Sequence, residues 1–221
     1  MPLRGINKVR ILDVNPDHPD PGITRMAGEM IRKGGVVVFP TQCLYGLGAD
    51  ARNAEAVARI FAIKRRPPTK PLLILIPGRN DLATVTDTIP LAAKRIMDAF
   101  WPGNVTLLFT SNASLPASLT AGTGKIGVRL PLHPVAAELV RIVGGPITGT
   151  SANLSGFPGA TAIDELEWDI SGQVDLVLNA GSLKGGIGST IVDITVNPPV
   201  ILREGIITAK KIFEALSGPL H

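Results

Sequence analysis

Residues 23–41 of the chain read ITRMAGEMIRKGGVVVFPT, and this stretch joins a helical pattern to a strand pattern. Its first half carries apolar residues at helical spacing, namely Ile23, Met26, Ala27, Met30 and Ile31. Gly34-Gly35 then end the helix, and the apolar run 36–39 is typical of a strand buried on both faces. A helix that leads into a buried strand predicts an α/β fold.

The same alternation continues along the chain without repeats or an obvious linker, which favours a single domain over residues 1–221. Further strands are expected at 72–76, 105–109, 126–130, 146–150, 174–178, 190–194 and 200–203. Further helices are expected at 53–61, with Asn53 as its N-cap, and at 91–100, 135–143 and 209–216. The predicted architecture is mixed α/β (α+β), with one twisted open sheet of parallel and antiparallel strands flanked by helices.

The composition is that of a globular protein, with 45% hydrophobic and 18% charged residues. Its longest apolar runs, 36–39 and 72–76, are too short to cross a bilayer, so no membrane partner is expected. Residues 1–8 lack the apolar region of a secretory signal, which makes the cytoplasm the expected compartment. The net charge of +4 favours anionic partners, whereas 4% aromatic residues argue against a platform that stacks several bases.

Several common functional motifs are absent. The single cysteine, Cys43, and the scattered histidines His18, His133 and His221 give no zinc-ligand spacing. In Gly122-Thr123-Gly124-Lys125 the following Ile126 stands where a P-loop requires Ser or Thr. Residues 186–191 lack the third glycine of a dinucleotide fingerprint, and no Gly-x-Ser-x-Gly elbow occurs. P-loop NTPases, Rossmann oxidoreductases and nucleophile-elbow hydrolases are therefore excluded.

Polar and basic residues follow several predicted strands. Thr41, Arg129, Ser151, Asn153 and Arg203 all stand at or just beyond a strand end. In open α/β sheets ligands bind outside the carboxyl ends of strands, so these side chains form one site if their strands are neighbours. Each residue also has a structural alternative, because such residues organise turns or form surface ion pairs, and Lys64-Arg65-Arg66 are solvated cations at many helix ends.

The chain resembles the YrdC-like family in a series of blocks that occur in the family's order. The blocks are GGVVVFPT (34–41), YGL (45–47), KRRP (64–67), PL (71–72), VRLP (128–131), HP (133–134), SANLSG (151–156), STIVD (189–193) and LREG (202–205). The resemblance implies a YrdC-like fold with a motif core of about residues 20–206. At this length it implies the short form of the family, without an extra carboxy-terminal domain.

The family includes threonylcarbamoyl-adenylate synthases. The resemblance therefore implies a nucleotidyltransferase that condenses L-threonine, bicarbonate and ATP to threonylcarbamoyl-AMP and pyrophosphate, the first step of the t6A37 modification of tRNA. The expected cofactor is Mg²⁺ bound with ATP, with no metal held by the protein and no redox or organic cofactor. The expected recipients of the intermediate are tRNA or tRNA-modification proteins.

The resemblance also assigns roles to residues of this chain. No protein nucleophile is implied, and Lys64 and Arg66 would act as charge stabilisers. The residues implied for ATP are Lys64, Arg66, Lys125, Ser151, Asn153, Gly159 and Arg203. The residues implied for threonine are Thr41, Arg129, Gly149 and Ser189, with Arg129 pairing with the carboxylate. The chain departs from the family pattern at Gln42-Cys43, Gly149-Thr150 and Gly159, positions that bear on nucleotide contacts and amino-acid preference.

Two other functions stay open. The first is a noncatalytic RNA- or nucleotide-binding paralogue that acts in tRNA or ribosome maturation. A paralogous branch shares an opening similar to His18-Pro19-Asp20-Pro21 but tends to lose the Ser-Ala-Asn block, and residues 151–153 retain it, which favours the synthase. The second is carbamoyl transfer as in hydrogenase maturation proteins, which the absence of their Cys-rich zinc segments disfavours.

Overall fold

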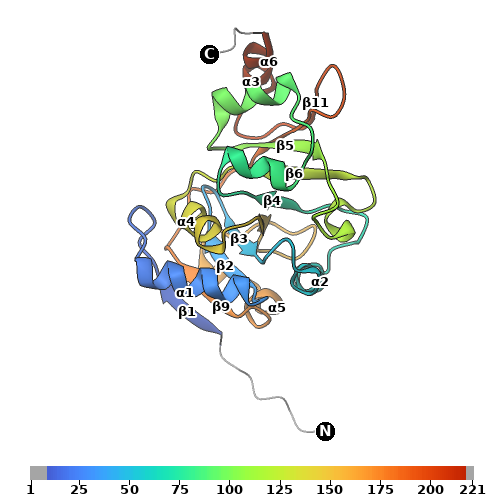
Figure 1. Cartoon of the computed structure of the whole chain (residues 1–221). Helices are drawn as coiled ribbons and strands as arrows, with labels where there is room; N and C mark the ends of the chain where they lie inside the picture. Colours follow the sequence, from blue (N-terminus) through green and yellow to red (C-terminus); the bar gives the residue numbers. More distant parts are fainter. Residues whose placement is uncertain (1–8, 218–221) are drawn as a thin grey trace.

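The computed structural model describes residues 9–217 (Figure 1). The amino-terminal residues 1–8 and His221, both used above, lie outside that range. The helices are α1 (Pro21–Arg32), α2 (Ala54–Ile63), α3 (Leu91–Phe100), α4 (Pro134–Val143), α5 (Trp168–Ser171) and α6 (Ala209–Ser217). Short 3₁₀ turns lie at η1 (Arg79–Thr84), η2 (Ala117–Thr120) and η3 (Ile163–Glu165).

The strands form two mixed sheets. The five-stranded sheet has the order β1-β9-β2-β3-β8, made of β1 (Arg10–Asp13), β9 (Leu176–Asn179), β2 (Val37–Pro40), β3 (Tyr45–Gly48) and β8 (Thr150–Ser151). The six-stranded sheet has the order β11-β10-β5-β6-β4-β7, made of β11 (Val200–Arg203), β10 (Thr190–Asp193), β5 (Val105–Thr110), β6 (Lys125–Arg129), β4 (Leu73–Leu75) and β7 (Ile147–Thr148). Each sheet contains both parallel and antiparallel pairs.

The chain passes from one sheet to the other at Gly149, the single residue between β7 and β8. A Cβ at this position would lie 2.7 Å from Leu73 Cδ1 and 2.8 Å from Leu75 Cγ, so only glycine fits without a shift of these leucines. Thr148 secures the junction, because its hydroxyl donates to Leu47 O at 3.1 Å and accepts from Ala49 N at 3.0 Å. The two sheets are therefore fixed to each other where β3 meets β7.

Alternation along the strands divides the apolar residues between two cores. Val37 and Phe39 pack with α1 and α4 over one face of the five-stranded sheet. Val38 and Leu47 face the opposite way, into a larger core that also receives residues from α2, α3 and α6. Figure 1 shows α3 and α6 beside β5, with α1 and α4 lying together at the other sheet. Both cores hold the strand ends in fixed positions.

Helix starts follow the capping rules. Asn53 caps α2 as expected, because its Oδ1 accepts from Glu55 N and Ala56 N, each at 3.0 Å. Asp20 caps α1, where Pro21 occupies the first position and needs no N–H partner. Gly34 follows α1 with φ +86°, a conformation that favours glycine.

The mixed α/β class is confirmed, and the expected helices occur within a few residues of their predicted bounds. The strands are distributed over two sheets where the sequence suggested one. The stretch 146–150, expected as one strand, is split between β7 and β8 by the passage at Gly149. Strands β1 and β3 were not predicted. Within residues 9–217, no helix is long and apolar enough to cross a membrane.

Candidate functional site

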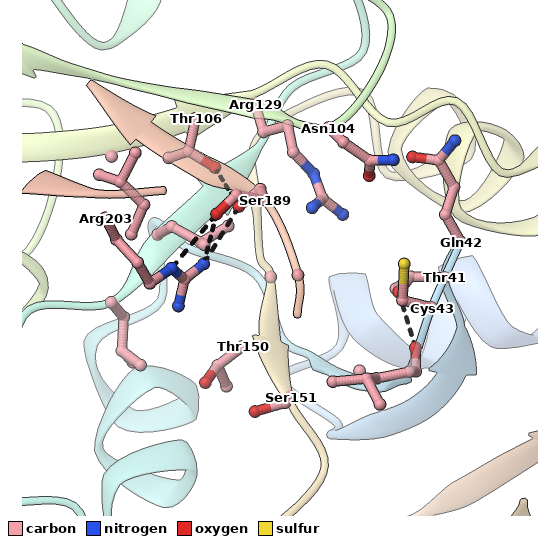
Figure 2. A pocket seen from close by; sticks show the side chains of 18 of the residues that line it. Thr41, Gln42, Cys43, Asn104, Thr106, Arg129, Thr150, Ser151, Ser189 and Arg203 are labelled. Atoms are coloured by element: carbon pink, nitrogen blue, oxygen red, sulfur yellow. Dashed lines mark hydrogen bonds between the residues drawn. The ribbon is translucent and has the colours of Figure 1, made fainter. Parts of the chain in front are cut away.

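A cavity of about 470 Å³ is lined by residues of both sheets (Figure 2). The five-stranded sheet contributes the turn between β2 and β3, with Thr41, Gln42 and Cys43, and the strand β8 with Ser151. The six-stranded sheet contributes strand ends from β6, β10 and β11 and the start of β5. Segments that lie far apart in the sequence therefore meet in one concave site.

The lining is positively charged. Arg66, Arg129 and Arg203 line the cavity, and no Asp or Glu of the described chain does so. Figure 2 shows the Arg129 and Arg203 side chains directed toward the open space between the two walls. Guanidinium groups bind carboxylates and phosphates through two parallel hydrogen bonds, so this lining suits an anionic ligand.

Arg129 differs from the other two arginines in having a buried donor without a partner. Its Nε is buried and has no hydrogen-bond partner among residues 9–217. Burial lowers the pKa of Arg129 to about 10, the charge of Arg203 lowers it further, and only ionisation of Cys43 would raise it. The side chain still carries a proton at neutral pH, so the cavity contains a buried cation that a ligand's carboxylate or phosphate can neutralise.

Arg203, by contrast, is held in a network at the end of β11. Its Nη2 donates to Ser189 O at 2.7 Å, and its Nε donates to the same oxygen at 3.2 Å. The Ser189 and Thr106 hydroxyl oxygens are 3.0 Å apart, so one hydroxyl donates to the other. This network fixes Arg203 and leaves its remaining N–H groups for an anion.

The turn between β2 and β3 forms the third wall. Thr41 Oγ1 donates to Leu44 O at 2.6 Å, which closes the turn and occupies the hydroxyl proton. Gln42 Oε1 is buried without a hydrogen-bond partner in the described chain, so it offers an acceptor in the wall of the cavity. Cys43 is 8% exposed, and burial raises the pKa of its thiol, which keeps it neutral at pH 7.

Ser151 lies at the entrance to a tight turn that Lys64 supports from beneath. The Ser151 hydroxyl donates to Asn153 Oδ1, and Asn153 Nδ2 donates to Leu154 O and Phe157 O, each at 2.7 Å. Lys64 is 1% exposed and donates to the Ser151 and Asn153 carbonyl oxygens. Burial, and then the charge of Arg66, lower the pKa of Lys64 to about 7.

The cavity brings together most of the residues that the sequence nominated. Those that line it are Thr41, Arg66, Arg129, Gly149, Ser151, Ser189 and Arg203. Lys64 and Asn153 lie behind the lining, in the turn beneath Ser151. Gly159 packs against the Leu44 side chain, where a Cβ would lie 2.7 Å from Leu44 Cδ1. Lys125 starts β6, at the opposite end from Arg129, and its Nζ is ion-paired to Asp193 Oδ2 at 2.7 Å.

The nominated set lacked several lining residues, among them Asn104, Thr106 and the pair Gln42-Cys43. Thr106 had a detectable signal, because it is a hydroxyl residue inside an otherwise apolar strand, and such a residue needs a buried partner. Gln42 and Cys43 had appeared only as departures from the family pattern. Nothing local marked Asn104, which reaches the cavity through the position of β5.

The fold and the cavity define an α/β protein with an arginine-lined anion site where two mixed sheets meet. The profile of the Sua5_yciO_yrdC family, described as "Telomere recombination", matches residues 29–205. The chain belongs to this family, in agreement with the resemblance seen in the sequence.

Individual relatives extend this result. The chain is 39% identical over 203 residues to the threonylcarbamoyl-AMP synthase of Bacillus subtilis, which covers 91% of this chain and 58% of that protein. A solved structure of Pyrococcus abyssi Sua5 complexed with L-threonine superposes with a TM-score of 0.89 at 35% identity, over 94% of this chain and 61% of that chain. Escherichia coli YciO gives a TM-score of 0.84 at 30% identity, over 92% of this chain and 99% of that chain. The chain thus spans less than two thirds of the B. subtilis and P. abyssi relatives and nearly all of YciO.

Proposed function

We propose that the chain catalyses the condensation of L-threonine, bicarbonate and ATP to threonylcarbamoyl-AMP, with release of pyrophosphate. The observation that carries the proposal is a cavity that residues 9–217 line with three arginines and no Asp or Glu, in a family whose curated members include threonylcarbamoyl-AMP synthases. Both ATP and threonine are anionic at the groups that such a cavity would hold. The reaction is a nucleotidyl transfer, and its expected place is the cytoplasm.

Different residues of the cavity wall would bind different parts of the substrates. Arg129, whose Nε has no partner within the described chain, would bind the threonine carboxylate near Thr41 and Gln42. Arg66 and Arg203 would bind phosphates, since both line the cavity with guanidinium groups. The Ser151 hydroxyl would contact the nucleotide.

The chemistry requires positioning and charge neutralisation more than a protein nucleophile. The threonine nitrogen attacks bicarbonate, and loss of water gives the carbamate. A carbamate oxygen then forms a bond to the α-phosphorus of ATP while the bond from that phosphorus to the bridging oxygen breaks, and pyrophosphate leaves. Negative charge accumulates on the phosphoryl oxygens during this step, and the cavity arginines would stabilise it.

Mg²⁺ fits this site as an ion that enters bound to the triphosphate of ATP. Within residues 9–217 no cluster of three or more His, Cys, Asp or Glu side chains is placed to hold a metal ion. The cavity hydroxyls of Ser151, Thr106 and Ser189 are weak ligands that suit an ion bound mainly by phosphates and water. Bound in this way, the ion would neutralise charge on the departing pyrophosphate.

The test is synthesis by the purified protein. The protein is incubated with ATP, Mg²⁺, bicarbonate and L-threonine, and threonylcarbamoyl-AMP is detected by mass spectrometry together with pyrophosphate. We expect both products, and we expect neither when threonine or bicarbonate is omitted. Absence of product with retained binding of ATP or RNA would instead identify a noncatalytic binding protein. Transfer to tRNA by added modification proteins tests the proposed recipients.

A further inference from the structure

One of the connections between the two sheets runs along the cavity. Residues 180–189 lead from β9 of the five-stranded sheet to β10 of the six-stranded sheet. Within this connection Gly186, Ile187, Gly188 and Ser189 line the cavity. The cavity lies where the two sheets meet, so a segment that joins the sheets is placed to reach over the space between them.

Hydrogen bonds hold this connection on either side of a short span. On one side Gly185 N donates to Cys43 O at 3.0 Å, and on the other Ile206 N donates to Gly188 O at 3.1 Å. Within the described part of the chain, residues 186–187 form no hydrogen bond with other backbone groups. The span can therefore move without breaking such bonds, and a short mobile span between fixed ends is typical of a lid.

The span combines backbone freedom with one large apolar side chain. Gly185, Gly186 and Gly188 have φ values of +71°, +121° and +76°, a region that glycine adopts without strain. A Cβ on Gly186 would meet only Cys43 Sγ, at 4.0 Å, so close packing does not hold the backbone there. Ile187 lines the cavity and is nevertheless 70% exposed. Closure over a ligand would remove this side chain from water, which is favourable.

We propose that residues 186–188 are a lid that closes over the occupied cavity, and that the Ile187 side chain then covers the ligand and excludes water from it. The identity of the ligand rests on the proposed synthesis of threonylcarbamoyl-AMP. The closure itself rests on the two fixed ends, the glycines and the exposed isoleucine between them.

Exclusion of water has a direct purpose in this reaction. The product joins a carbamoyl carbon to a phosphate oxygen, and a water molecule that attacks this carbon breaks that bond. The fragments are AMP and the carbamate of threonine, which loses CO₂ and returns threonine. Each such event consumes one ATP without a net product, so a closed lid would raise the yield of product per ATP.

The yield per ATP tests the role of Ile187 under single-turnover conditions with protein in excess. For Ile187→Ser we expect less threonylcarbamoyl-AMP per pyrophosphate released, and about tenfold faster dissociation of ATP·Mg²⁺, because the cover by one aliphatic side chain is lost. Ile187→Leu keeps an apolar cover and should behave like the unaltered protein. Val196→Ser, which removes an exposed apolar side chain in the turn between β10 and β11, is the matched control. Equal yield and dissociation for Ile187→Ser and Val196→Ser would overturn the role of Ile187.

Hydrogen exchange of the unaltered protein tests closure without a variant. We expect the amides of residues 186–188 to exchange rapidly in the free protein and slowly with ATP·Mg²⁺ and L-threonine bound, with bicarbonate left out to prevent turnover. Unchanged exchange with both ligands bound would overturn the lid, even if the synthesis assay succeeds. Slower exchange in a protein that makes no threonylcarbamoyl-AMP would support the lid and reject the proposed function. Binding of neither ligand would reject both.

Discussion

Arg129 combines a half-buried side chain with a position in the cavity wall, and its buried Nε has no partner within residues 9–217. We expect Arg129→Met to lower kcat/KM for threonine by about 100-fold or more, because two charge-assisted hydrogen bonds contribute about 1.5–3 kcal/mol each. Arg129→Lys should recover little of this loss, since an ammonium cannot form the paired contact. Steady-state kinetics with threonine as the varied substrate provide the measurement.

The same substitution should not destabilise the fold. Burial of an unpaired cation is costly, so replacement by an apolar side chain of similar length should leave the free energy of unfolding unchanged or raise it by about 1–3 kcal/mol. Urea denaturation of Arg129→Met without ligand measures this. A large loss of stability would mean that Arg129 has a structural role instead.

Lys64 gives the stability of the protein a specific dependence on pH. Burial lowers its pKa from 10.5 to about 7 in the folded state, so between these values the unfolded chain binds more protons than the folded chain. The free energy of unfolding should therefore rise with pH across this window, by up to about 1.4 kcal/mol per pH unit from this group. Urea denaturation of the unaltered protein and of Lys64→Met at several pH values isolates the effect. Parallel pH curves for the two proteins would contradict the lowered pKa.

At the scale of elements, the segments around β10 and β11 meet at Gly205. A Cβ on Gly205 would lie 2.5 Å from Gly188 O and 2.6 Å from Thr190 N. Both are backbone atoms, which can move only if the backbone itself shifts. Gly205 N also donates to Thr190 Oγ1 at 3.0 Å. This close approach keeps Arg203 against Ser189.

We expect Gly205→Ala to separate these segments, to lower the free energy of unfolding by about 1–3 kcal/mol and to weaken ATP binding. Thermal unfolding and calorimetry measure the two effects. Gly145→Ala is the control, because its Cβ would meet only the flexible end of Arg52 at 3.1 Å. Equal behaviour of the two variants would show that the close approach at Gly205 does not position the site.

The helices and the buried strands could be predicted because apolar spacing and helix caps such as Asn53 involve residues that are close together in the sequence. Strand β3, which contains Gly46 and Gly48, was not predicted because its sequence lacks a continuous apolar run, and its pairing with β2 supplies the stability. The division into two sheets depends on the lack of a side chain at Gly149 and on leucines more than seventy residues earlier in the chain. Such packing depends on contacts between distant residues, so the sequence around Gly149 does not predict it.

The candidate site was predictable in its residue types but not in its geometry. Strand ends nominated Arg129 and Arg203, and the sheet order β11-β10-β5-β6 brings them together although their strands are not neighbours. The burial of Lys64 was not predictable, because a run of three basic residues usually faces solvent. Lys125 had the expected charge, but its position at the start of β6 places it in an ion pair with Asp193.

At the scale of the whole molecule, the net charge of +4 adds to the field of a cavity that has three arginines and no lining carboxylate in the described chain. We expect ATP affinity to fall about tenfold when KCl is raised from about 0.05 M to about 0.5 M, because salt shortens the range of these interactions. Fluorescence titration at several salt concentrations measures the slope. Adenosine, which is uncharged, is the control ligand, and an equal slope for both ligands would exclude the electrostatic explanation.

The passage of the chain at Gly149 has a mechanical consequence for the molecule. Ser151 and Thr41 sit on one side of that one-residue hinge point, and Arg129 and Arg203 sit on the other. A substrate that contacts residues of both sheets binds only while the sheets keep their relative positions. Its binding free energy therefore stabilises the arrangement of the two sheets. At a concentration of 100 times its Kd, such a ligand adds about 2.7 kcal/mol to the resistance to unfolding. The occupied protein should then melt as one cooperative unit at a higher temperature than the empty one.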